Sequence, residues 1–476
     1  MLDATQSRPQ VPTQAMTHAP GAASAHATSV PVPRRWPLRA SDVWALVLGN
    51  GVLIGLMWVR HGNAAELGTP AAILTALGQV TALFGTYLAL IQLVLMSRSP
   101  WLDQVFGMDG IARAHRWLGF ATMWLILGHV CATTVGYALA DRTGVVDEFV
   151  TLLTTYPYVM WSLGGLVGFM LVAFTSFRAV RRRMGYETWF GLHLYAYLGI
   201  ALAFMHQLMV GTDFMADTIA RVYWIAMYAV AAALILVFRF GQPLALHQRH
   251  QFRVANVVQE APGVASIYVT GRDLDRLAAR AGQYFNLRLL TRQGWYRAHP
   301  FSLSAAPNGR FLRFTVKALG DWSASLLAVP KGTRLILEGP YGVLTGARRT
   351  RQKVLLVAGG VGITPLRALL EALPGRPGDV VLVYRAPREE DVVFRAELDQ
   401  LAVIRNARVH YLVGRRGTPG VPQAPLAPAA LAAVVPDLAE RDVYLCGPGT
   451  MMDDVAGGLR RAGIRPAQIH LEHFTY

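Results

Sequence analysis

Six long apolar runs occupy the first half of the chain. They cover residues 43–59, 71–96, 117–138, 156–177, 189–210 and 219–239, and few charged residues interrupt them. Each run is close to the ~20 residues that an α-helix needs to cross the hydrocarbon core of a bilayer. We therefore predict a bundle of six membrane-spanning helices within residues 39–242.

The second half of the chain has a different pattern. Residues 251–345 contain short alternating segments, FRVANVVQE, ASIYVTG, QYFNLRLL, RFTVKALG and TRLILEG, which are typical of a small antiparallel β-barrel. From residue 352 onward, buried-type strands such as KVLLVAGG, DVVLVYRA and DVYLCGPG alternate with helical segments, which indicates a doubly wound parallel sheet. The predicted fold is multidomain: the bundle, a β-barrel over 248–346 and an α/β domain over 350–476.

The N-terminal segment and the cysteines narrow the class of protein further. Residues 1–38 are rich in Ala, Pro, Ser, Thr and Gln, without the apolar core of a cleavable signal, and predict a disordered tail. Cys131 and Cys446 are the two cysteines and fall in different halves of the chain. We therefore expect no disulfide framework, zinc knuckle or iron–sulfur cluster.

The charge distribution indicates an orientation in the membrane. The net charge is +16, and the segment FRAVRRRMGYE between the fourth and fifth runs is strongly basic. The segments after the third and fifth runs carry acidic residues, namely Asp141, Asp147, Glu148, Asp213 and Asp217. Because basic loops stay in the cytosol, we predict a multi-pass plasma membrane protein of the bacterial inner-membrane type, with its N-terminus and C-terminal half cytosolic. The basic residues then face anionic lipid, and nucleic acid is not an expected partner.

Four of the thirteen histidines fall within or at the ends of the apolar runs: His115, His129, His193 and His206. Polar groups at membrane depth are costly, so such positions point to function. The 14 residues from His115 to His129 and the 13 from His193 to His206 both correspond to a rise of ~20 Å. The two pairs therefore define the same two levels of the bundle, where facing imidazoles would bind one haem each.

Other interpretations of these histidines are weaker. A single histidine can simply bond a neighbouring helix, but two matched pairs favour ligation. Zinc needs a compact ligand cluster, and a proton relay needs carboxylates at membrane depth. The spacing of the pair on the fifth helix fits less well. Along a regular helix, 13 residues leave His193 and His206 ~140° apart around the helix axis. The fifth helix therefore needs a bend or a π-bulge, or the two haems are rotated differently.

These features resemble the transmembrane domain of the ferric reductase and NADPH oxidase family. The resemblance rests on six helices with paired histidines on the third and fifth, on the pair His115-Arg116, and on the basic segment before GYETWFGLH. It implies two haem b groups with His115, His129, His193 and His206 as iron ligands. Arg116 and Arg181–Arg183 would then bind haem propionates, although basic residues here also suit plain membrane anchoring.

The segment HPFSLSAAP is similar to the flavin signature of the ferredoxin–NADP reductase superfamily, as its NADPH oxidase branch writes it. The resemblance implies FAD, with Phe301 against the isoalloxazine ring and Ser302 at its N5 edge. It further assigns flavin contacts to Gln283, Tyr284, His299 and Pro300, and pyrophosphate contacts to Lys317, Gly320, Trp322 and Ser323.

The α/β domain carries a glycine-rich turn between its first strand and helix, a place where backbone amides and the helix dipole bind pyrophosphate. Its residues are Gly359, Gly360, Gly362, Thr364 and Pro365, and the spacing is not G-x-G-x-x-G. The turn and the CGPG segment, with Cys446, Gly447 and Pro448, resemble the nicotinamide-side motifs of the superfamily, which place Cys446 near the nicotinamide. Taken alone, Cys446 suits a buried small residue equally well.

Two further features concern the nucleotide. Arg385 ends the second strand, where an arginine suits the 2′-phosphate of NADPH, with help from Arg415 or Arg416, so NADPH is favoured over NADH. The chain ends HLEHFTY, which is similar to the superfamily's Glu-x-aromatic ending. Glu472 and Phe474 would cover the flavin face where the nicotinamide enters, and Tyr476 is the alternative stacking ring.

The predicted function is transfer of electrons from cytosolic NADPH through FAD and two haems to an outer acceptor. Family oxidases carry a further histidine one turn beyond the outer ligand of the third helix, where this chain has Thr133. The outer acidic residues suit transient Fe³⁺ binding or are ordinary solvated charges. A ferric chelate and O₂ therefore both stand as acceptors. A relay subunit that serves an outer partner protein, or a transporter with a nucleotide domain and no haem, are the alternatives of other classes.

Overall fold

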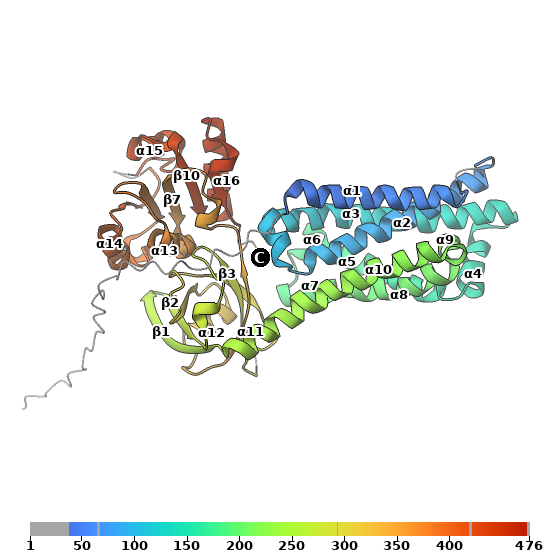
Figure 1. The fold of residues 1–476 in the computed structure, drawn as a ribbon, viewed down its shortest axis with the longest axis horizontal. Helices are drawn as coiled ribbons and strands as arrows, with labels where there is room; N and C mark the ends of the chain where they lie inside the picture. Colours follow the sequence, from blue (N-terminus) through green and yellow to red (C-terminus); the bar gives the residue numbers. More distant parts are fainter. Residues whose placement is uncertain (1–37, 64–66, 293, 418–420, 474–476) are drawn as a thin grey trace, which may run out of the picture. The chain divides into compact units, whose positions relative to one another are not determined.

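The computed structural model describes residues 38–63, 67–292, 294–417 and 421–473 (Figure 1). The predicted disordered tail lies outside these residues except for residue 38, as do Phe474 and Tyr476. Within them, six helices are long and apolar enough to cross a membrane, which confirms the predicted number of spans.

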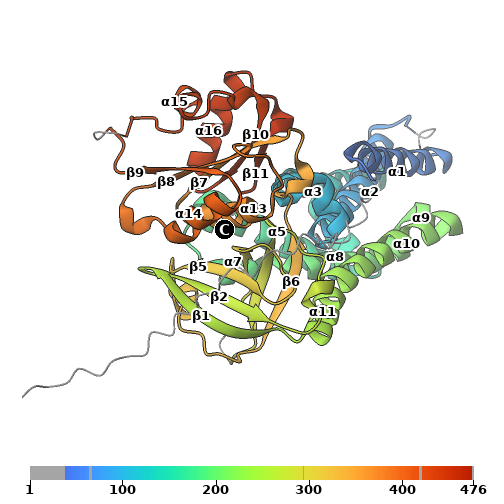
Figure 2. The same cartoon turned by 60° about the vertical axis from the view of Figure 1, so that its left-hand side comes forward.

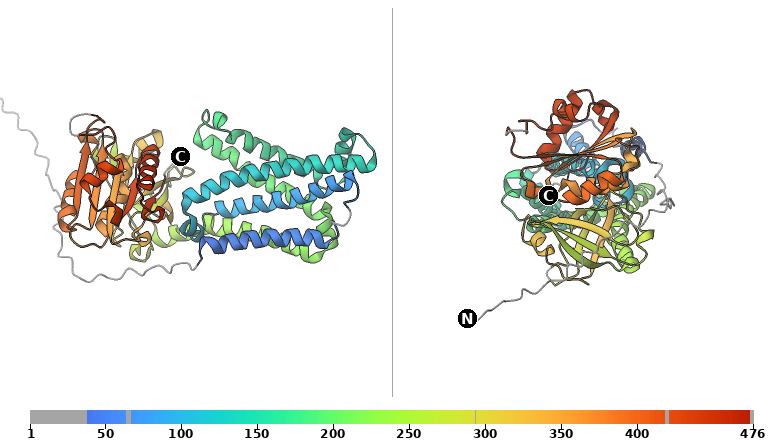
Figure 3. Two further views of the ribbon diagram at one scale, coloured as in Figure 1. Left: turned by 90° about the horizontal axis from the view of Figure 1, so that it is seen from above. Right: turned by 90° about the vertical axis from the view of Figure 1, so that its left-hand side faces the viewer.

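The spans are mostly longer than the apolar runs that predicted them (Figures 1 and 3). They are α1 (Ala40–Arg60), α2 (Pro70–Met96), α3 (Pro100–Asp141), α5 (Val159–Ser176), α7 with α8 (Tyr186–His193 and Tyr195–Val210), and α10 (Thr218–Ile235), which continues through a π-helical turn (Leu236–Gly241) into α11 (Gln242–His250). Three short helices connect them: α4 (Val145–Thr155), α6 (Arg178–Arg181) and α9 (Thr212–Ala216).

Glycines bring the helices of the bundle into close contact, as is usual where lipid supplies no hydrophobic drive between helices. A Cβ atom on Gly78 of α2 would overlap the Thr133 side chain and lie 3.1 Å from its backbone nitrogen on α3. A Cβ atom on Gly165 of α5 would lie 2.8 Å from the carbonyl oxygen of Gly199 on α8. Small residues therefore fix two helix pairs, α2 with α3 and α5 with α8.

Two interruptions shape the helices that carry the histidines. Helix α3 begins seventeen residues before its apolar run, and Gly107 within this polar extension adopts φ +67° and ψ 156°, which kinks the helix. The fifth span breaks at Leu194, directly after His193, so α7 and α8 are separate segments. The interruption lies between His193 and His206, at the side of His193 that faces the rest of the span.

The flavin-type domain consists of two three-stranded antiparallel sheets, ordered β1-β2-β5 and β4-β3-β6. Its strands are β1 (Arg253–Ala261), β2 (Val264–Thr270), β3 (Tyr284–Leu289), β4 (His299–Ser302), β5 (Leu312–Lys317) and β6 (Leu335–Tyr341). Inward-facing side chains such as Phe252, Phe285 and Phe314 are fully buried between the sheets. The predicted antiparallel barrel is thus confirmed, with β4 as a strand that the alternation pattern did not mark.

The nucleotide-type domain is a five-stranded parallel sheet, ordered β11-β10-β7-β8-β9. Its strands are β7 (Lys353–Gly359), β8 (Val380–Ala386), β9 (Arg408–Val413), β10 (Arg441–Cys446) and β11 (Ile469–Leu471). Helices α13 (Ile363–Ala372) and α14 (Arg395–Ile404) cover one face, and α15 (Pro428–Val434) and α16 (Gly449–Arg461) cover the other (Figure 2). Alternate residues of β7 enter the two resulting cores, Leu356 one and Leu355 the other. This confirms the doubly wound fold.

Candidate electron-transfer site

The first histidine pair joins α3 to the end of α7. The ring centroids of His115 and His193 lie 5.9 Å apart, with their planes at 65°. Two imidazoles on opposite sides of one iron atom, each bonded at about 2 Å, need a centroid separation of about 6 Å. The Nδ1 atom of His115 is buried and has no hydrogen-bond partner among the described residues. The pair therefore fits a bis-histidine haem.

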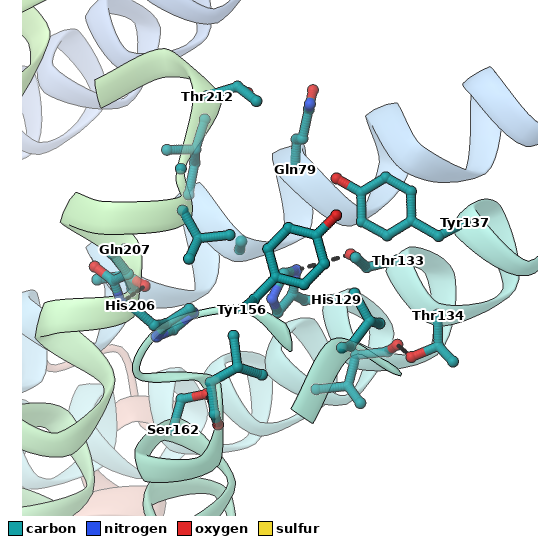
Figure 4. Close-up of a pocket in the computed structure, with 18 of the residues that line it drawn as sticks. Gln79, His129, Thr133, Thr134, Tyr137, Tyr156, Ser162, His206, Gln207 and Thr212 are labelled. Atoms are coloured by element: carbon teal, nitrogen blue, oxygen red, sulfur yellow. Dashed lines mark hydrogen bonds between the residues drawn. The ribbon is translucent and has the colours of Figure 1, made fainter. Parts of the chain in front are cut away.

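The second pair, His129 and His206, faces one cavity of about 200 Å³ (Figure 4). The Nδ1 atom of His129 lies 2.9 Å from the carbonyl oxygen of Gly78, which can only accept, so this nitrogen carries the proton. Thr133 Oγ1 lies 3.2 Å from the same nitrogen. Nε2 of His129 is therefore the nitrogen with its lone pair available, and histidine ligands of metals usually donate their other ring N–H to a carbonyl in this way.

The opposite wall of the cavity is also consistent with a prosthetic group. His206 extends from α8, and its Nδ1 atom is buried without a partner among the described residues. The cavity is lined mainly by apolar side chains, together with Tyr137 of α3 and Tyr156 after α4. The residues present therefore fit a second haem.

The predicted flavin signature begins on β4, and predicted pyrophosphate contacts lie on and beside helix α12 (Asp321–Leu326). The Trp322 ring stacks on His299 at 4.1 Å and on Phe301 at 5.9 Å. The Nε1 donor of Trp322 is buried without a partner in the described part of the chain. Burial lowers the pKa of His299, so the ring is neutral at pH 7 and presents an apolar face. Ser302 is buried and lies opposite Tyr284 in the β3–β4 pairing.

Several elements meet around Gly342, at the end of the barrel, where φ is +97°. Its carbonyl oxygen accepts a bond of 3.4 Å from Gln283 Nε2, and its amide donates to Asp103 of α3 at 2.8 Å. A Cβ atom on Gly342 would lie 2.7 Å from a carboxylate oxygen of Glu472 and 3.0 Å from the Tyr284 ring. Because Gly342 has no side chain, the side-chain carboxylate of Glu472 can reach the end of the barrel.

Glu472 lies in an unusual environment. Its side chain is buried, and neither carboxylate oxygen has a hydrogen-bond partner among the described residues. Burial, followed by the nearby carboxylates of Asp103 and Asp109, raises the pKa of Glu472 to about 8. A carboxyl group that is protonated near neutral pH at a cofactor site is suited to proton exchange.

The glycine-rich turn between β7 and α13 packs directly against the CGPG segment. A Cβ atom on Gly362 would overlap the carbonyl of Cys446, and one on Gly447 would lie 2.6 Å from a methionine methyl group. Gly360 adopts φ +54°, which favours glycine. Thr364 and Pro365 are buried in the first turn of α13. Burial raises the pKa of the Cys446 thiol, so this residue is placed at the turn as a neutral thiol.

The remaining predicted residues occupy varied settings. The Arg385 guanidinium donates to the carbonyl oxygens of Ala386, Leu412 and Gly414 and so ties β8 to β9. Burial and the positive charge of Arg416 lower the pKa of Arg385. An anion beside these two arginines would relieve the repulsion between them. Ser323 Oγ accepts from the Gly320 amide at 3.0 Å and caps α12. Lys317, Arg415 and Pro448 are exposed, as is Arg116.

The acidic residues at the other end of the bundle do not form a metal cluster. Glu148 is buried and accepts a bond from Thr143, and Asp213 lies 2.8 Å from His61. Asp217 caps α10 and bonds His61, whose pKa it raises. Among the described residues no group of three or more His, Cys, Asp or Glu side chains could hold a metal ion.

The sequence patterns missed four residues that the structure places beside these sites. Asp103 and Asp109 lie on the polar extension of α3, and Asp109 accepts a bond of 2.8 Å from the His473 amide. Tyr186 and Trp189 of α7 contact His299 and His193 respectively. Two carboxylates shortly before the apolar run 117–138 were visible in the sequence, but their partners lie more than 200 residues away.

Comparison with known proteins concerns the domain organisation. The family model for a ferric reductase like transmembrane component matches residues 81–204, that for an FAD-binding domain matches 248–345, and that for an oxidoreductase NAD-binding domain matches 356–457. The ferredoxin reductase component of a 3-ketosteroid-9-alpha-monooxygenase from Mycolicibacterium smegmatis is 32% identical over 49% of this chain and 67% of its own length. The toluate 1,2-dioxygenase electron transfer component of Pseudomonas putida is 28% identical over 48% and 68%.

Among solved structures, the flavohem-like FAD/NAD binding domain of a nitric oxide dioxygenase from Vibrio cholerae is 26% identical, with a TM-score of 0.40, and covers 47% of this chain and 98% of that one. The three domain matches identify a transmembrane oxidoreductase with FAD- and NAD-binding modules. The chain belongs to the family that joins a ferric reductase-like transmembrane domain to a reductase module of the ferredoxin–NADP reductase type.

Proposed function

We propose that this protein transfers electrons from cytosolic NADPH, through FAD and two bis-histidine haems, to a ferric chelate or O₂ on the outer side of the membrane. One observation carries the proposal: histidines pair at two levels of the bundle, at a ligating separation in the first pair and around one cavity in the second. When bound, FAD would accept hydride and release single electrons, and the haems would carry those electrons.

The side chains support each stage in a different way. Phe301 and Ser302 would hold the flavin, and the turn at Gly359–Gly362 would bind the nucleotide pyrophosphate through backbone amides. Glu472 would hold or release a proton beside the flavin. The Gly78 carbonyl fixes the tautomer of His129 and so directs its free nitrogen into the second cavity.

Two features support the preferred nucleotide and the direction. Arg385 and Arg416 form a cationic pair at the ends of β8 and β9, which favours NADPH over NADH. The basic segment at Arg178–Arg183 follows α5, and positive loops are cytosolic. The second pair then lies at the outer level. Because the acidic residues near that end form no ion cluster among the described residues, a resident Fe³⁺ site receives no support there.

The test is an absorption spectrum of the full chain, purified in detergent and supplied with haem and FAD. Addition of NADPH without oxygen should produce a sharp haem α-band at two haems per chain, and air or ferric chelate should then bleach it. The faster acceptor identifies the activity. If the protein binds no haem, the proposal is refuted, and a transporter with a nucleotide-binding domain becomes the favoured interpretation. Reduction that is reoxidised only in the presence of an outer partner protein would favour a relay subunit.

A further inference from the structure

A continuous row of aromatic rings connects the predicted flavin site to the first histidine pair. The row starts at Trp322, which stacks on His299 at 4.1 Å. His299 lies 6.4 Å from Tyr186, Tyr186 lies 6.1 Å from Trp189, and Trp189 lies 5.0 Å from His193. Each separation is close to or within the ~4.5–7 Å between ring centroids that is usual for aromatic contacts.

The two middle rings, Tyr186 and Trp189, lie in the first turns of α7 and are held from both sides. The Arg181 guanidinium lies over Trp189 at 4.5 Å and over Tyr186 at 5.8 Å, within the range of cation–π attraction. Phe190 stacks on Tyr186 at 6.0 Å with an angle of 13°. Both rings therefore pack against neighbouring side chains of their own segment.

The row of rings crosses from the bundle to the flavin-type domain between Tyr186 and His299, beside an ion pair that joins the two domains. Tyr186 belongs to the bundle and His299 to the flavin-type domain. Beside them, Glu187 of α7 pairs with Arg297 of the flavin-type domain at 3.7 Å. Because both side chains of this ion pair are partly exposed, it contributes only a weak restraint on the position of the two rings.

Aromatic residues at the end of a membrane helix commonly serve as interfacial anchors. Two observations go beyond that role here. The Nε1 donor of Trp189 is buried and has no partner among the described residues, so it faces protein rather than headgroups. Each end of the row also contacts a residue already placed at a cofactor site, namely His299 and His193.

We propose that Tyr186 and Trp189 form the bridge through which electrons pass from the flavin site to the first histidine pair, an inference that rests on the proposed function. Electronic coupling decays steeply across empty space, so rings in contact raise the transfer rate. In each step one electron leaves the reduced flavin and reduces one ferric haem. No covalent bond forms between protein groups, the flavin's protons pass to water, and neither bridging ring is itself oxidised.

The experiment uses the full chain loaded with FAD and haem. Trp189→Leu and Tyr186→Leu remove one ring each, Trp189→Phe and Tyr186→Phe keep a ring, and Tyr195→Leu removes a 47% exposed ring near the same end of the fifth span. Haem content and haem midpoint potentials are measured by spectroelectrochemistry. The flavin-to-haem rate is measured by stopped flow with NADPH, and the direct haem reduction rate with dithionite.

We expect each leucine variant to retain two haems with unchanged potentials and to lose at least ~tenfold in the flavin-to-haem rate, which corresponds to ~1.4 kcal/mol in the activation free energy. The phenylalanine variants and Tyr195→Leu should retain the rate, and dithionite reduction should be unchanged throughout. A normal flavin-to-haem rate in both leucine variants overturns the bridge. Loss of haem or a shifted potential in both overturns it as well, since the rings would then support the haem. A wild-type chain without haem overturns the proposed function itself.

Discussion

The contact between Gly78 and Thr133 offers a direct test of the second haem site. Gly78 has two roles, because its carbonyl oxygen fixes His129 and its missing side chain lets α2 approach α3. In Gly78→Ala the new Cβ atom would overlap Thr133 Oγ1 and lie 3.1 Å from the Thr133 nitrogen and 3.3 Å from its Cα atom. The side chain alone cannot relieve these contacts, so the helices must move apart.

The size of the effect follows from two estimates. Overpacking a tight contact costs about 1–3 kcal/mol, and disturbing the group that orients a histidine ligand typically lowers metal affinity about 10- to 100-fold. We therefore expect Gly78→Ala to retain the haem at His115 and His193 and to lose most of the haem at His129 and His206.

The assay is haem stoichiometry per chain, combined with a redox titration that separates the two haems. Gly128→Ala is the matched control, because its Cβ atom would meet only a Thr81 methyl carbon at 3.8 Å. Thr133→Ala in the Gly78→Ala background removes the overlapping hydroxyl and should recover part of the binding. Two haems with unchanged potentials in Gly78→Ala would refute the reasoning, since the Gly78–His129 contact would then have no bearing on haem binding.

Three further predictions concern the reductase module. Gly362→Ala should raise the KM for NADPH by ~5- to ~150-fold, equivalent to about 1–3 kcal/mol, because its Cβ atom meets the Cys446 backbone. Gly449→Ala is the control, since the nearest contact of its Cβ atom is at 3.7 Å. A KM in Gly362→Ala equal to that of the unmodified protein would contradict the prediction. Glu472 has a pKa of about 8 when folded and a usual value of 4.5, so its contribution to stability is complete below about pH 4.5 and lost as the pH rises to about 8. Glu472→Gln should flatten the fall in Tm over that window, and an unchanged slope would count against the buried carboxyl. Arg416→Ala should lower the NADPH-to-NADH preference about tenfold, or ~1.4 kcal/mol, and a constant ratio of the two kcat/KM values would exclude the role.

The parts of the fold that the sequence predicts well are those governed by one simple constraint. A membrane span must be apolar over ~20 residues, so the six helices and their histidines were evident from the pattern. Strands of the parallel sheet are buried on both faces and form short continuous apolar runs, as in KVLLVAGG. Strand β4 is absent from the alternating segments because only four residues, His299–Ser302, form it and they do not alternate.

The elements that the sequence predicts poorly depend on contacts between distant segments. Residues 100–116 continue α3 although they are not an apolar run, because Asp103 and Asp109 bond backbone amides of the reductase module. The 13-residue spacing allowed a bend, a π-bulge or rotated haems in the fifth span, and nothing local indicated the interruption at Leu194. The sequence suggested only a phosphate-binding role for Arg385. It did not indicate that the Arg385 side chain also bonds a carbonyl oxygen of β9, a strand that lies more than 20 residues further along the chain.

Helix α3 gives the proposed pathway its geometry, because it contributes to both histidine pairs and to the attachment of the reductase module. Asp103 bonds Gly342, and Asp109 bonds the amide of His473, next to Glu472. His115 lies twelve residues beyond Asp103, which limits the rise between them to ~18 Å along a helix. One helix therefore connects the attachment points of the reductase module to the first histidine pair, and Asp109 lies only six residues before His115. The kink at Gly107 separates the two attachment points, so that the barrel end is bonded before the kink and the C-terminal segment after it, on the same side as His115.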